Sequence, residues 1–423
     1  MAATIRKEPN NMLEVQGFRG LRFNVDKTGP LEVIVTPPYD VITPEQRASL
    51  AAQSPYSMVH ISLPEPGANE TPYDAAARIL NWWIADGALV QDAAKSFYVL
   101  EQVFEDKGRE RIRHGFLALA RLPESGERTI LGHEQTFAKT IEDRLRLIEA
   151  TQANLEPVFV LYSDPSGQAS RCLSNTMQRP PDITVRTMDG VVQRVWRIDY
   201  EPHVTQALRD SQLYIADGHH RFRTSCAYRD ACRDKGMGAG PHDYILMGFV
   251  AIDDPGLVIE PTHRLLNPPT EFDIAKLAPW FECEPGGDDL ARVVENEPGC
   301  AIGLATPGRR CLLRLRDIDR TTLLGADRVP AWRDLDVAIM HRGIVERIMQ
   351  WPADTPFAYE RDAAKAIEMV DCGKYGAALI LRSPRAEQIQ ACAQAGEPMP
   401  HKSTYFFPKL PSGAALYSLK QGW

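Results

Sequence analysis

One short segment concentrates four titratable side chains around a glycine: Asp217, Gly218, His219, His220 and Arg221. The apolar residues 213–216 before it predict a buried strand, and residues 222–228 after it suit a helix. A strand, a tight glycine turn and a helix aim backbone N–H groups and a positive helix dipole at an anion. The polar groups could instead merely cap the helix, but a cap needs fewer charges. The segment therefore predicts a site for an anion such as phosphate.

A second group of charged residues lies upstream. His133 and Glu134 precede a predicted helix that carries Lys139 and Arg144. On that helix the pairs Lys139–Asp143 and Glu142–Arg146 are four residues apart, so ion pairing on a solvated face is one interpretation. His133 and Glu134 are on a loop, where they either face the same pocket or lie at the surface.

Three further segments carry candidate residues. Asp40 follows Pro37-Pro38, which stiffen the loop and give the carboxylate a fixed position, although it could also simply close a turn. His263 and Arg264 follow another apolar run and either share the anion or form an ordinary strand end. Lys402 belongs to a polar segment between Pro400 and aromatic residues close to the C-terminus.

The composition excludes some classes of protein. With 423 residues the chain is long enough for two or three domains, and its net charge of −8 argues against a nucleic-acid partner. No apolar run is long enough to span a membrane, and the polar N-terminus, residues 1–11, predicts no signal segment. The eight cysteines form no C-x-x-C pair, which favours reduced thiols and a cytoplasmic location.

A mixed α+β fold is predicted from the periodicity. Strands are predicted over residues 31–35, 59–63, 97–104, 113–120, 158–162, 191–198, 244–252 and 377–381. Helices are predicted over residues 73–86, 201–211, 335–349 and 386–395. We expect four parts: residues 1–165, an N-terminal part with a mixed sheet; 166–268, the core with the Asp217–Arg221 segment; 269–330, a small α+β insertion; and 331–423, which completes the core.

These motifs together resemble a known family. The segments Pro37–Val41, His133–Glu134 with Lys139 and Arg144, Ala216–Arg221, Pro261–Arg264 and Met399–Leu410 are similar, in order, to the bacterial and archaeal family called domain of unknown function 1015. The Asp217–Arg221 segment also resembles the phosphate-binding motif of the ParB/sulfiredoxin superfamily, which includes free-serine kinases and nucleotide-using partition proteins. This implies a ParB/sulfiredoxin-like core around residues 213–264. Arg223, in place of a family glutamate, and His401, in place of a proline, depart from the pattern.

The resemblance implies a phosphoryl-transfer enzyme, a nucleotide-dependent kinase of small molecules. Phosphoryl transfer needs cations around the transferred group and a group that accepts the nucleophile's proton. The expected cofactor is ATP or ADP, with Mg²⁺, and the expected partner is a phosphorylated or hydroxylated small molecule. The expected proton-transfer groups are Asp40, Glu134, Asp217, His219 and His220. The expected phosphate ligands are Lys139, Arg144, Gly218, Arg221, His263, Arg264 and Lys402.

Three alternatives remain open at this stage. The site could hydrolyse a phosphate ester, or the chain could be a nucleotide-binding regulator of the ParB kind, although no helix-turn-helix is evident. It could also be a metal hydrolase that uses its histidines. Neither H-x-H nor H-E-x-x-H occurs, and adjacent histidines rarely bind one metal, so no metal ligands are assigned.

Overall fold

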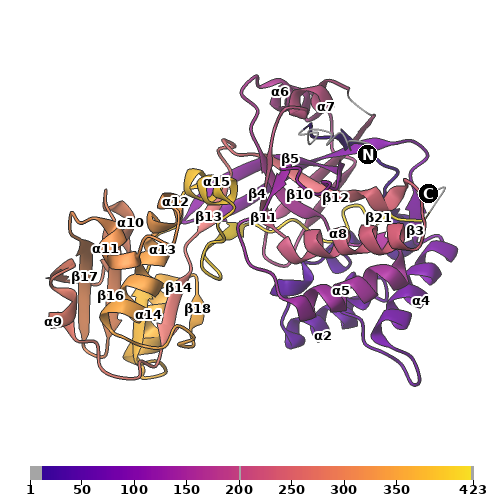
Figure 1. Cartoon of the computed structure of the whole chain (residues 1–423). Coiled ribbons are helices and arrows are strands. Elements are labelled where there is room, and N and C mark those ends of the chain that lie inside the picture. Colours follow the sequence, from indigo (N-terminus) through magenta and orange to yellow (C-terminus); the bar gives the residue numbers. More distant parts are fainter. Residues whose placement is uncertain (1–11, 200–201, 421–423) are drawn as a thin grey trace. The chain divides into compact units, whose positions relative to one another are not determined.

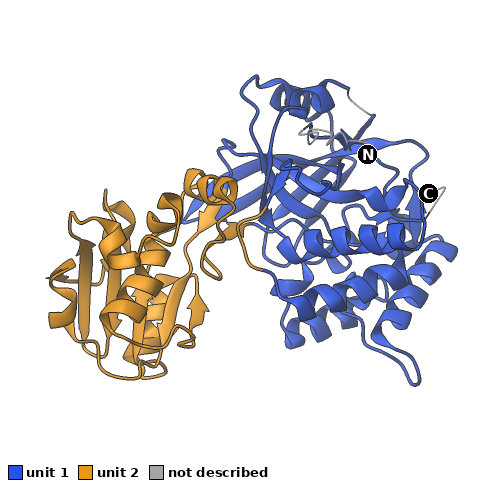
Figure 2. Cartoon of the chain, viewed as in Figure 1, with its two compact units in different colours: residues 1–131, 136–257, 408–423 blue, residues 132–135, 258–407 orange. Residues whose placement is uncertain are grey.

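The computed structural model describes residues 12–199 and 202–420 (Figure 1). Residues 1–11, where no signal segment is predicted, and the start of the predicted helix 201–211 lie outside the described residues. The fold is α+β, as the sequence predicts. Two compact units divide the chain: residues 1–131, 136–257 and 408–423 form unit 1, and residues 132–135 and 258–407 form unit 2 (Figure 2). The predicted four-part division stays a prediction.

Unit 1 is built on a nine-stranded mixed sheet in which β1 pairs with β5 and the other strands have the order β6-β11-β8-β12-β5-β4-β10-β9. Its strands are β1 (Val15–Gln16), β4 (Ser96–Asp106), β5 (Arg109–Arg121), β6 (Ile130–Leu131), β8 (Val158–Tyr162), β9 (Ile183–Arg186), β10 (Val192–Asp199), β11 (Leu213–Asp217) and β12 (Tyr244–Ala251). Two-stranded pairings add β2 (Leu21–Phe23) with β3 (Leu89–Gln91) and β7 (Ala153–Asn154) with β21 (Tyr417–Ser418). The β7–β21 pairing attaches the C-terminal segment to the region that carries the site.

Helices cover this sheet. They are α1 (Val25–Thr28), α2 (Pro44–Gln53), α3 (Val59–Ser62), α4 (Pro72–Ala85), α5 (Ala138–Thr151), α6 (Gln168–Thr176), α7 (Pro202–Leu208) and α8 (His219–Asp234), with the 3-10 turns η1 (Leu31–Val33), η2 (Tyr39–Val41) and η3 (Pro241–Asp243). Helices α5 and α8 lie side by side, and α4 packs on α5 (Figure 1). A layer of helices therefore backs the turn between β11 and α8.

Two strand predictions in this unit are wrong. The run 31–35 contains the 3-10 turn η1 (Leu31–Val33) instead of a strand, and the run 59–63 contains the helix α3 (Val59–Ser62). Ile34, Val59 and Ile61 are fully buried in the structure. A short apolar run with β-branched residues can form either a strand or a buried helical turn. Its pattern does not distinguish the two structures, which depend on the packing of the run in the tertiary structure.

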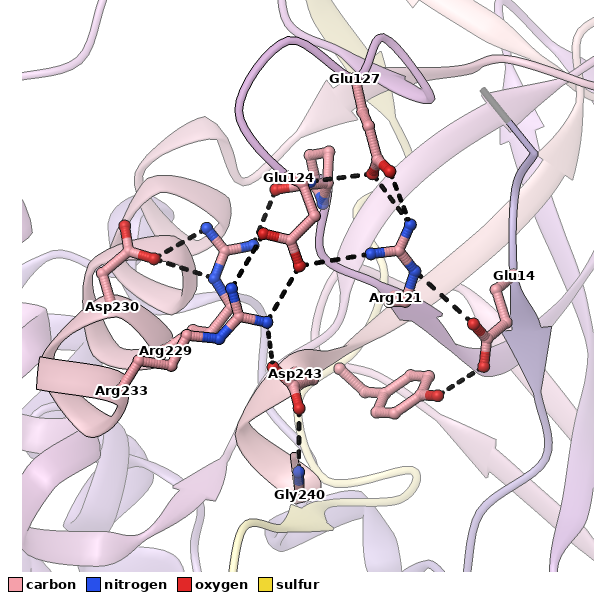
Figure 3. Close-up of polar contacts among 11 residues, drawn as sticks. Glu14, Arg121, Glu124, Glu127, Arg229, Asp230, Arg233, Gly240 and Asp243 are labelled. Carbon is pink, nitrogen blue, oxygen red and sulfur yellow. Dashed lines mark hydrogen bonds and ion pairs between the residues drawn. The ribbon is translucent and has the colours of Figure 1, made fainter. Parts of the chain in front are cut away.

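The C-terminal end of α8 is held by a network of ion pairs (Figure 3). Arg233 contacts Glu124 at 2.9 Å and Asp243 at 2.7 Å. Arg229 donates to the Pro123 carbonyl at 2.7 Å, and Arg121 contacts Glu124 at 3.5 Å. Several charges in one network hold geometry better than an isolated surface pair. The network therefore fixes one end of the helix whose other end begins at the candidate site.

Unit 2 contains a six-stranded antiparallel sheet in the order β15-β17-β16-β19-β14-β18. The strands of this sheet are β14 (His263–Leu266), β15 (Phe281–Pro285), β16 (Ala301–Thr306), β17 (Arg309–Leu315), β18 (Ala358–Glu360) and β19 (Ala377–Ile380). The other two strands of the unit, β13 (Val258–Glu260) and β20 (Tyr405–Phe407), pair with each other. Its helices are α9 (Ile274–Leu277), α10 (Leu290–Asn296), α11 (Arg320–Leu324), α12 (Pro330–Arg333), α13 (Asp336–Ala338), the π-helix η4 (Ile339–Ile348), α14 (Ala363–Asp371) and α15 (Ala386–Ala395). Helices α10 and α14 pack on the sheet through small apolar clusters.

Candidate functional site

The turn between β11 and α8 has the conformation that the sequence predicts. Gly218 has φ +91° and ψ 29°, in the left-handed region that glycine adopts without strain. A Cβ at this position would lie 3.0 Å from Cζ and Nε of Arg221. Glycine is therefore required twice, for the backbone turn and for the arginine that folds back over it.

The side chain of Arg221 is anchored at several points. Its Nη2 donates to Oδ2 of Asp217 at 2.5 Å, and its Nη1 donates to the carbonyl oxygen of Pro157. Nη1 also lies 3.8 Å from Oε2 of Glu156. Lys409, from the C-terminal segment, donates to the other carboxylate oxygen of Asp217. Asp217 thus lies between two cations at the N-terminal end of α8.

Glu156 is buried beside this cluster. Its Oε1 accepts a hydrogen bond from the backbone N–H of Tyr39 at 3.1 Å. Burial raises the pKa of the Glu156 carboxyl to about 6, against the opposing effect of Arg221, and the charge of Asp40 adds to the rise. A carboxyl that titrates near pH 6 can exchange a proton at physiological pH. Glu156 therefore has the property expected of a general acid or base.

Asp40 lies in the same cluster, on the 3-10 turn η2. Its side chain keeps contact with solvent, yet the surrounding protein and then the negative charge of Asp217 raise the pKa of its carboxyl. Arg221 and Lys409 act in the opposite direction. The site thus combines two carboxyls of raised pKa with two cations.

Arg144 and Lys139 differ in their surroundings. The Arg144 guanidinium lies 4.5 Å from the centre of the Tyr39 ring and donates to the Ser62 carbonyl at 2.7 Å. It also contacts Asp143 at 2.6 Å, so it has several protein partners. Lys139 is exposed on α5. Of these two expected phosphate ligands, only Arg144 lies against the cluster.

The two adjacent histidines occupy different environments. His219 is buried in the first turn of α8. His220 accepts a hydrogen bond at Nε2 from the backbone N–H of Phe137, at 3.1 Å, and its ring stacks on the Phe137 ring. Because Nε2 acts as acceptor, this contact assigns the proton of neutral His220 to Nδ1. His220 therefore joins the N-terminal end of α8 to the start of α5.

Unit 2 holds the remaining predicted residues. His133 contacts the Thr404 hydroxyl through Nε2 at 3.1 Å, and Glu134 accepts from the same hydroxyl at 3.4 Å. His263 accepts from the Leu381 N–H through Nδ1 at 3.2 Å. Burial lowers the pKa of His263 to about 4, which keeps this ring neutral at pH 7.

Arg264 is buried in unit 2 and bonded mainly to the backbone. Its Nη2 donates to the carbonyl oxygens of His401 and Lys402 at 3.1 and 3.0 Å, and Nη1 donates to the Thr262 carbonyl. Lys402 itself is exposed and has a positive φ of 53°. Burial lowers the pKa of Arg264 to about 10, so it stays charged at pH 7. Arg264 therefore supports the turn that carries Lys402.

The structure groups the predicted residues by unit. In unit 1 it brings together Asp40, Arg144, Asp217, Gly218 and Arg221. The candidates in unit 2 are His133, Glu134, His263, Arg264 and Lys402. A single pocket that contains both groups stays a prediction.

Sequence analysis missed Glu156 and assigned no role to Lys409. One signal for Glu156 was present: it is a carboxylate two residues before the apolar strand 158–162, where buried charge is rare unless paired. Lys409 gave no such signal, because it is distant in sequence from its partner Asp217. In the described part of the chain, no cluster of three or more His, Cys, Asp or Glu residues is arranged to hold a metal ion. None of the described helices is long and apolar enough to cross a membrane.

The family assignment is confirmed by comparison with known proteins. Residues 15–338 match the family described as "Protein of unknown function (DUF1015)", and the chain belongs to this family. Among curated proteins, no sequence matches significantly.

Several solved structures are similar in part. A conserved hypothetical protein from Pyrococcus furiosus is 13% identical with a TM-score of 0.32, covering 67% of this chain and 90% of its own. A free serine kinase in complex with AMP is 12% identical with a TM-score of 0.35, covering 69% of this chain and 88% of its own. SbnI from Staphylococcus aureus, with a C-terminal truncation, is 14% identical with a TM-score of 0.37, covering 73% and 90%. Similarity at this level does not establish a shared activity.

Proposed function

We propose that this protein is a phosphoryl-transfer enzyme, a nucleotide-dependent kinase of small molecules, with its phosphate site at the turn Asp217–Arg221. The observation that carries the proposal is the cluster at the start of α8. There Arg221 and Lys409 flank Asp217, and Glu156 and Asp40 have raised pKa values. Phosphoryl transfer uses both kinds of group, cations for the phosphoryl oxygens and a carboxylate for the proton.

The N-terminal end of α8 supports the phosphate assignment. Helix α8 is 16 residues long, and its N-cap residue, Gly218, provides no side-chain cap hydrogen bond. The first N–H groups of a helix point outward and carry partial positive charge, which favours a phosphate there. The motif's resemblance to the ParB/sulfiredoxin phosphate-binding segment supports the same assignment. We propose ATP or ADP as the phosphate donor, with Mg²⁺ on the donor phosphates, where it commonly binds.

Two carboxyls are candidates for the proton acceptor. Asp40, on the proline-stiffened turn η2, is the residue that the sequence predicts. Glu156 is the residue whose pKa, about 6, suits a base at neutral pH. Asp40→Asn should leave nucleotide affinity unchanged and lower turnover by roughly 10²-fold if Asp40 takes the proton. Unchanged turnover in Asp40→Asn, with a comparable loss in Glu156→Gln, would assign the role to Glu156.

Calorimetric titration with ATP and ADP, with and without Mg²⁺, tests the phosphate site. Arg221→Lys keeps the charge but removes the planar guanidinium that bonds Asp217 and the Pro157 carbonyl and so orders the cluster, and we therefore expect at least a tenfold weaker affinity. Lys107→Ala, in the exposed turn between β4 and β5, is the control and should bind as the wild type does.

Thermal unfolding of both variants checks that the fold is retained. Equal affinity in Arg221→Lys, Lys107→Ala and wild type would contradict the assignment. Nucleotide binding without phosphoryl transfer or hydrolysis would favour a regulator of the ParB kind. Release of phosphate from a monoester in the absence of nucleotide would favour a hydrolase.

A further inference from the structure

A charged arginine is buried in the sheet of unit 1. Arg113 of β5 is 1% exposed, and so is Gln102, its direct cross-strand partner on β4. Burial lowers the pKa of Arg113 to about 9, so the guanidinium stays charged at pH 7. Burying a charge costs free energy, and an apolar side chain often stabilises a core equally well. Stability alone therefore does not explain an arginine at this position.

This pair of side chains holds two consecutive carbonyl groups of the C-terminal segment. Nη2 of Arg113 donates to the carbonyl oxygen of Pro408, and Nε2 of Gln102 donates to that of Lys409 at 3.2 Å. The Gln102 amide is itself oriented by Arg113, whose Nε donates to Oε1 of Gln102 at 2.9 Å. Because a guanidinium has only donors, it fixes the amide with its oxygen toward Arg113 and its NH₂ group toward the carbonyl of Lys409.

The segment held in this way carries Lys409 to the candidate site. The Lys409 ammonium group donates to Oδ1 of Asp217, and the two side chains are only 10% and 14% exposed. Phe159, whose ring centre lies 4.7 Å from the Arg113 guanidinium, is the direct cross-strand partner of Asp217. The buried arginine therefore lies beside the pair of strands that ends at the site.

The place of Lys409 determines the charge at the start of α8. Together with Arg221 it neutralises Asp217, and it also opposes the rise in the pKa of the Asp40 carboxyl. If Lys409 left, more of the negative charge of Asp217 would face an incoming phosphate and would repel it. A lysine side chain has many rotamers, so anchoring its backbone lowers the entropy lost when it binds Asp217.

We propose that Arg113 and Gln102 are positioning residues of the phosphate site and that they act through Lys409. They hold the backbone at residues 408–409, so that the ammonium group stays on Asp217 and the start of α8 attracts phosphate. This inference rests on the proposed phosphate site at that turn.

Gln102→Glu tests the inference. Beside the charged Arg113 the new carboxylate stays ionised and keeps the acceptor for the guanidinium, but it has no N–H for the Lys409 carbonyl and repels it. Arg113 itself is a poorer choice, because a smaller side chain there leaves a void and unpaired carbonyls in the core. Gln102→Met is the second variant, since it removes the same donor without adding a charge, and it should give the same results.

Gln212→Glu is the matched control. Gln212 directly precedes β11, at the opposite end of that strand from Asp217. Its Nε2 donates to the Arg128 carbonyl at 3.0 Å, and its Oε1 accepts from the Tyr214 hydroxyl at 3.2 Å. The substitution therefore removes the same kind of bond, from an amide to a backbone carbonyl, away from residues 408–409.

The first measurement needs no ligand. Acetic anhydride acetylates deprotonated lysine amines, and peptide mass spectrometry gives the rate for Lys409. In Gln102→Glu this rate should rise roughly threefold or more, because a lysine that leaves its carboxylate partner loses its proton more readily. Gln212→Glu should react as the wild type does. Thermal unfolding checks that both variants are folded.

The second measurement is nucleotide affinity by calorimetry, alone and in a Lys409→Met background. Gln102→Glu should weaken the affinity roughly fivefold, since one cation no longer neutralises Asp217. In the Lys409→Met background the same change should have no further effect, because residues that act through one group are not additive. A purely structural role of Gln102 would weaken the affinity in both backgrounds.

The same acetylation rate and affinity in Gln102→Glu and Gln212→Glu would overturn the positioning role. Full additivity with Lys409→Met would overturn it too. If the wild type binds nucleotide and Lys409→Met binds it equally well, the inference is wrong while the phosphate site stands. If neither ATP nor ADP binds the wild type, the proposed function is wrong and the positioning role is overturned with it.

Discussion

Arg221 donates a 2.5 Å hydrogen bond to Asp217, the residue four positions before it, across the left-handed turn at Gly218. The contact joins the last residue of β11 to the first turn of α8. It neutralises Asp217 and turns the guanidinium toward Glu156, 3.8 Å away. The geometry of the whole cluster therefore depends on the conformation of this one turn.

Replacing Gly218 with alanine should disturb both the fold and the site. The positive φ of 91° and the 3.0 Å approach of the new Cβ to Arg221 both oppose the change, and we expect a loss of roughly 1–3 kcal/mol in the free energy of unfolding. Urea unfolding measures this loss, and calorimetry measures nucleotide affinity.

Gly108→Ala is the control for that experiment. Gly108 has a φ of 74°, but a Cβ there would meet nothing within 4 Å. It should therefore show the backbone strain without any change in nucleotide affinity. Equal nucleotide affinity in both alanine variants would separate the Gly218 turn from the phosphate site.

The buried carboxyl of Glu156 makes stability depend on pH. Its pKa in the folded protein, about 6, is above the ordinary value of 4.5. Folding therefore favours the protonated form, and this contribution is complete below pH 4.5 and is lost as the pH rises through 6. The shift corresponds to about 2 kcal/mol. Relative to Glu156→Gln, the wild type should lose about that much between pH 4.5 and 7.5.

Urea unfolding at pH 4.5, 6 and 7.5 provides the comparison, since other titrating groups largely cancel in the difference. A difference that does not change with pH would show that Glu156 is not buried as described. The same carboxyl should give the rising limb of kcat/KM near pH 6 if it is the base. Asp40→Asn should move that limb to lower pH, because the charge of Asp40 raises the pKa of Glu156.

Arg264→Gln should loosen one turn of unit 2. The guanidinium holds the carbonyls of His401 and Lys402, and glutamine is too short to replace both bonds. Hydrogen exchange of residues 401–404 should become at least tenfold faster. Arg292→Gln is the control, since Arg292 of α10 forms an exposed ion pair with Asp289 and is part of the same unit. No change in exchange would remove Arg264 from the support of this turn.

Much of the local structure follows from residue pattern alone. Residues 158–162 and 386–395 form β8 and α15 with the predicted bounds, and the predicted antiparallel pair 97–104 and 113–120 is the hairpin of β4 and β5. In each of these segments the spacing of the apolar residues, or the type of the flanking residues, matches the element that the tertiary structure contains. The runs 31–35 and 59–63 are predicted as strands but are helical in the structure, because β-branched residues can be buried in a helical turn as well as in a strand.

The sequence by itself determined the turn at Gly218, since aspartate, glycine and arginine between a strand and a helix leave few alternative conformations. It also placed Asp40 on a stiff turn. Only the tertiary structure showed that Lys409 binds Asp217 and that Glu156 lies beside Arg221. Lys409 contacts Asp217 although 192 residues separate them, and its backbone carbonyl accepts a hydrogen bond from Gln102 of β4 at 3.2 Å. A raised pKa, likewise, arises from burial and neighbouring charges, which depend on packing and not on the order of residues.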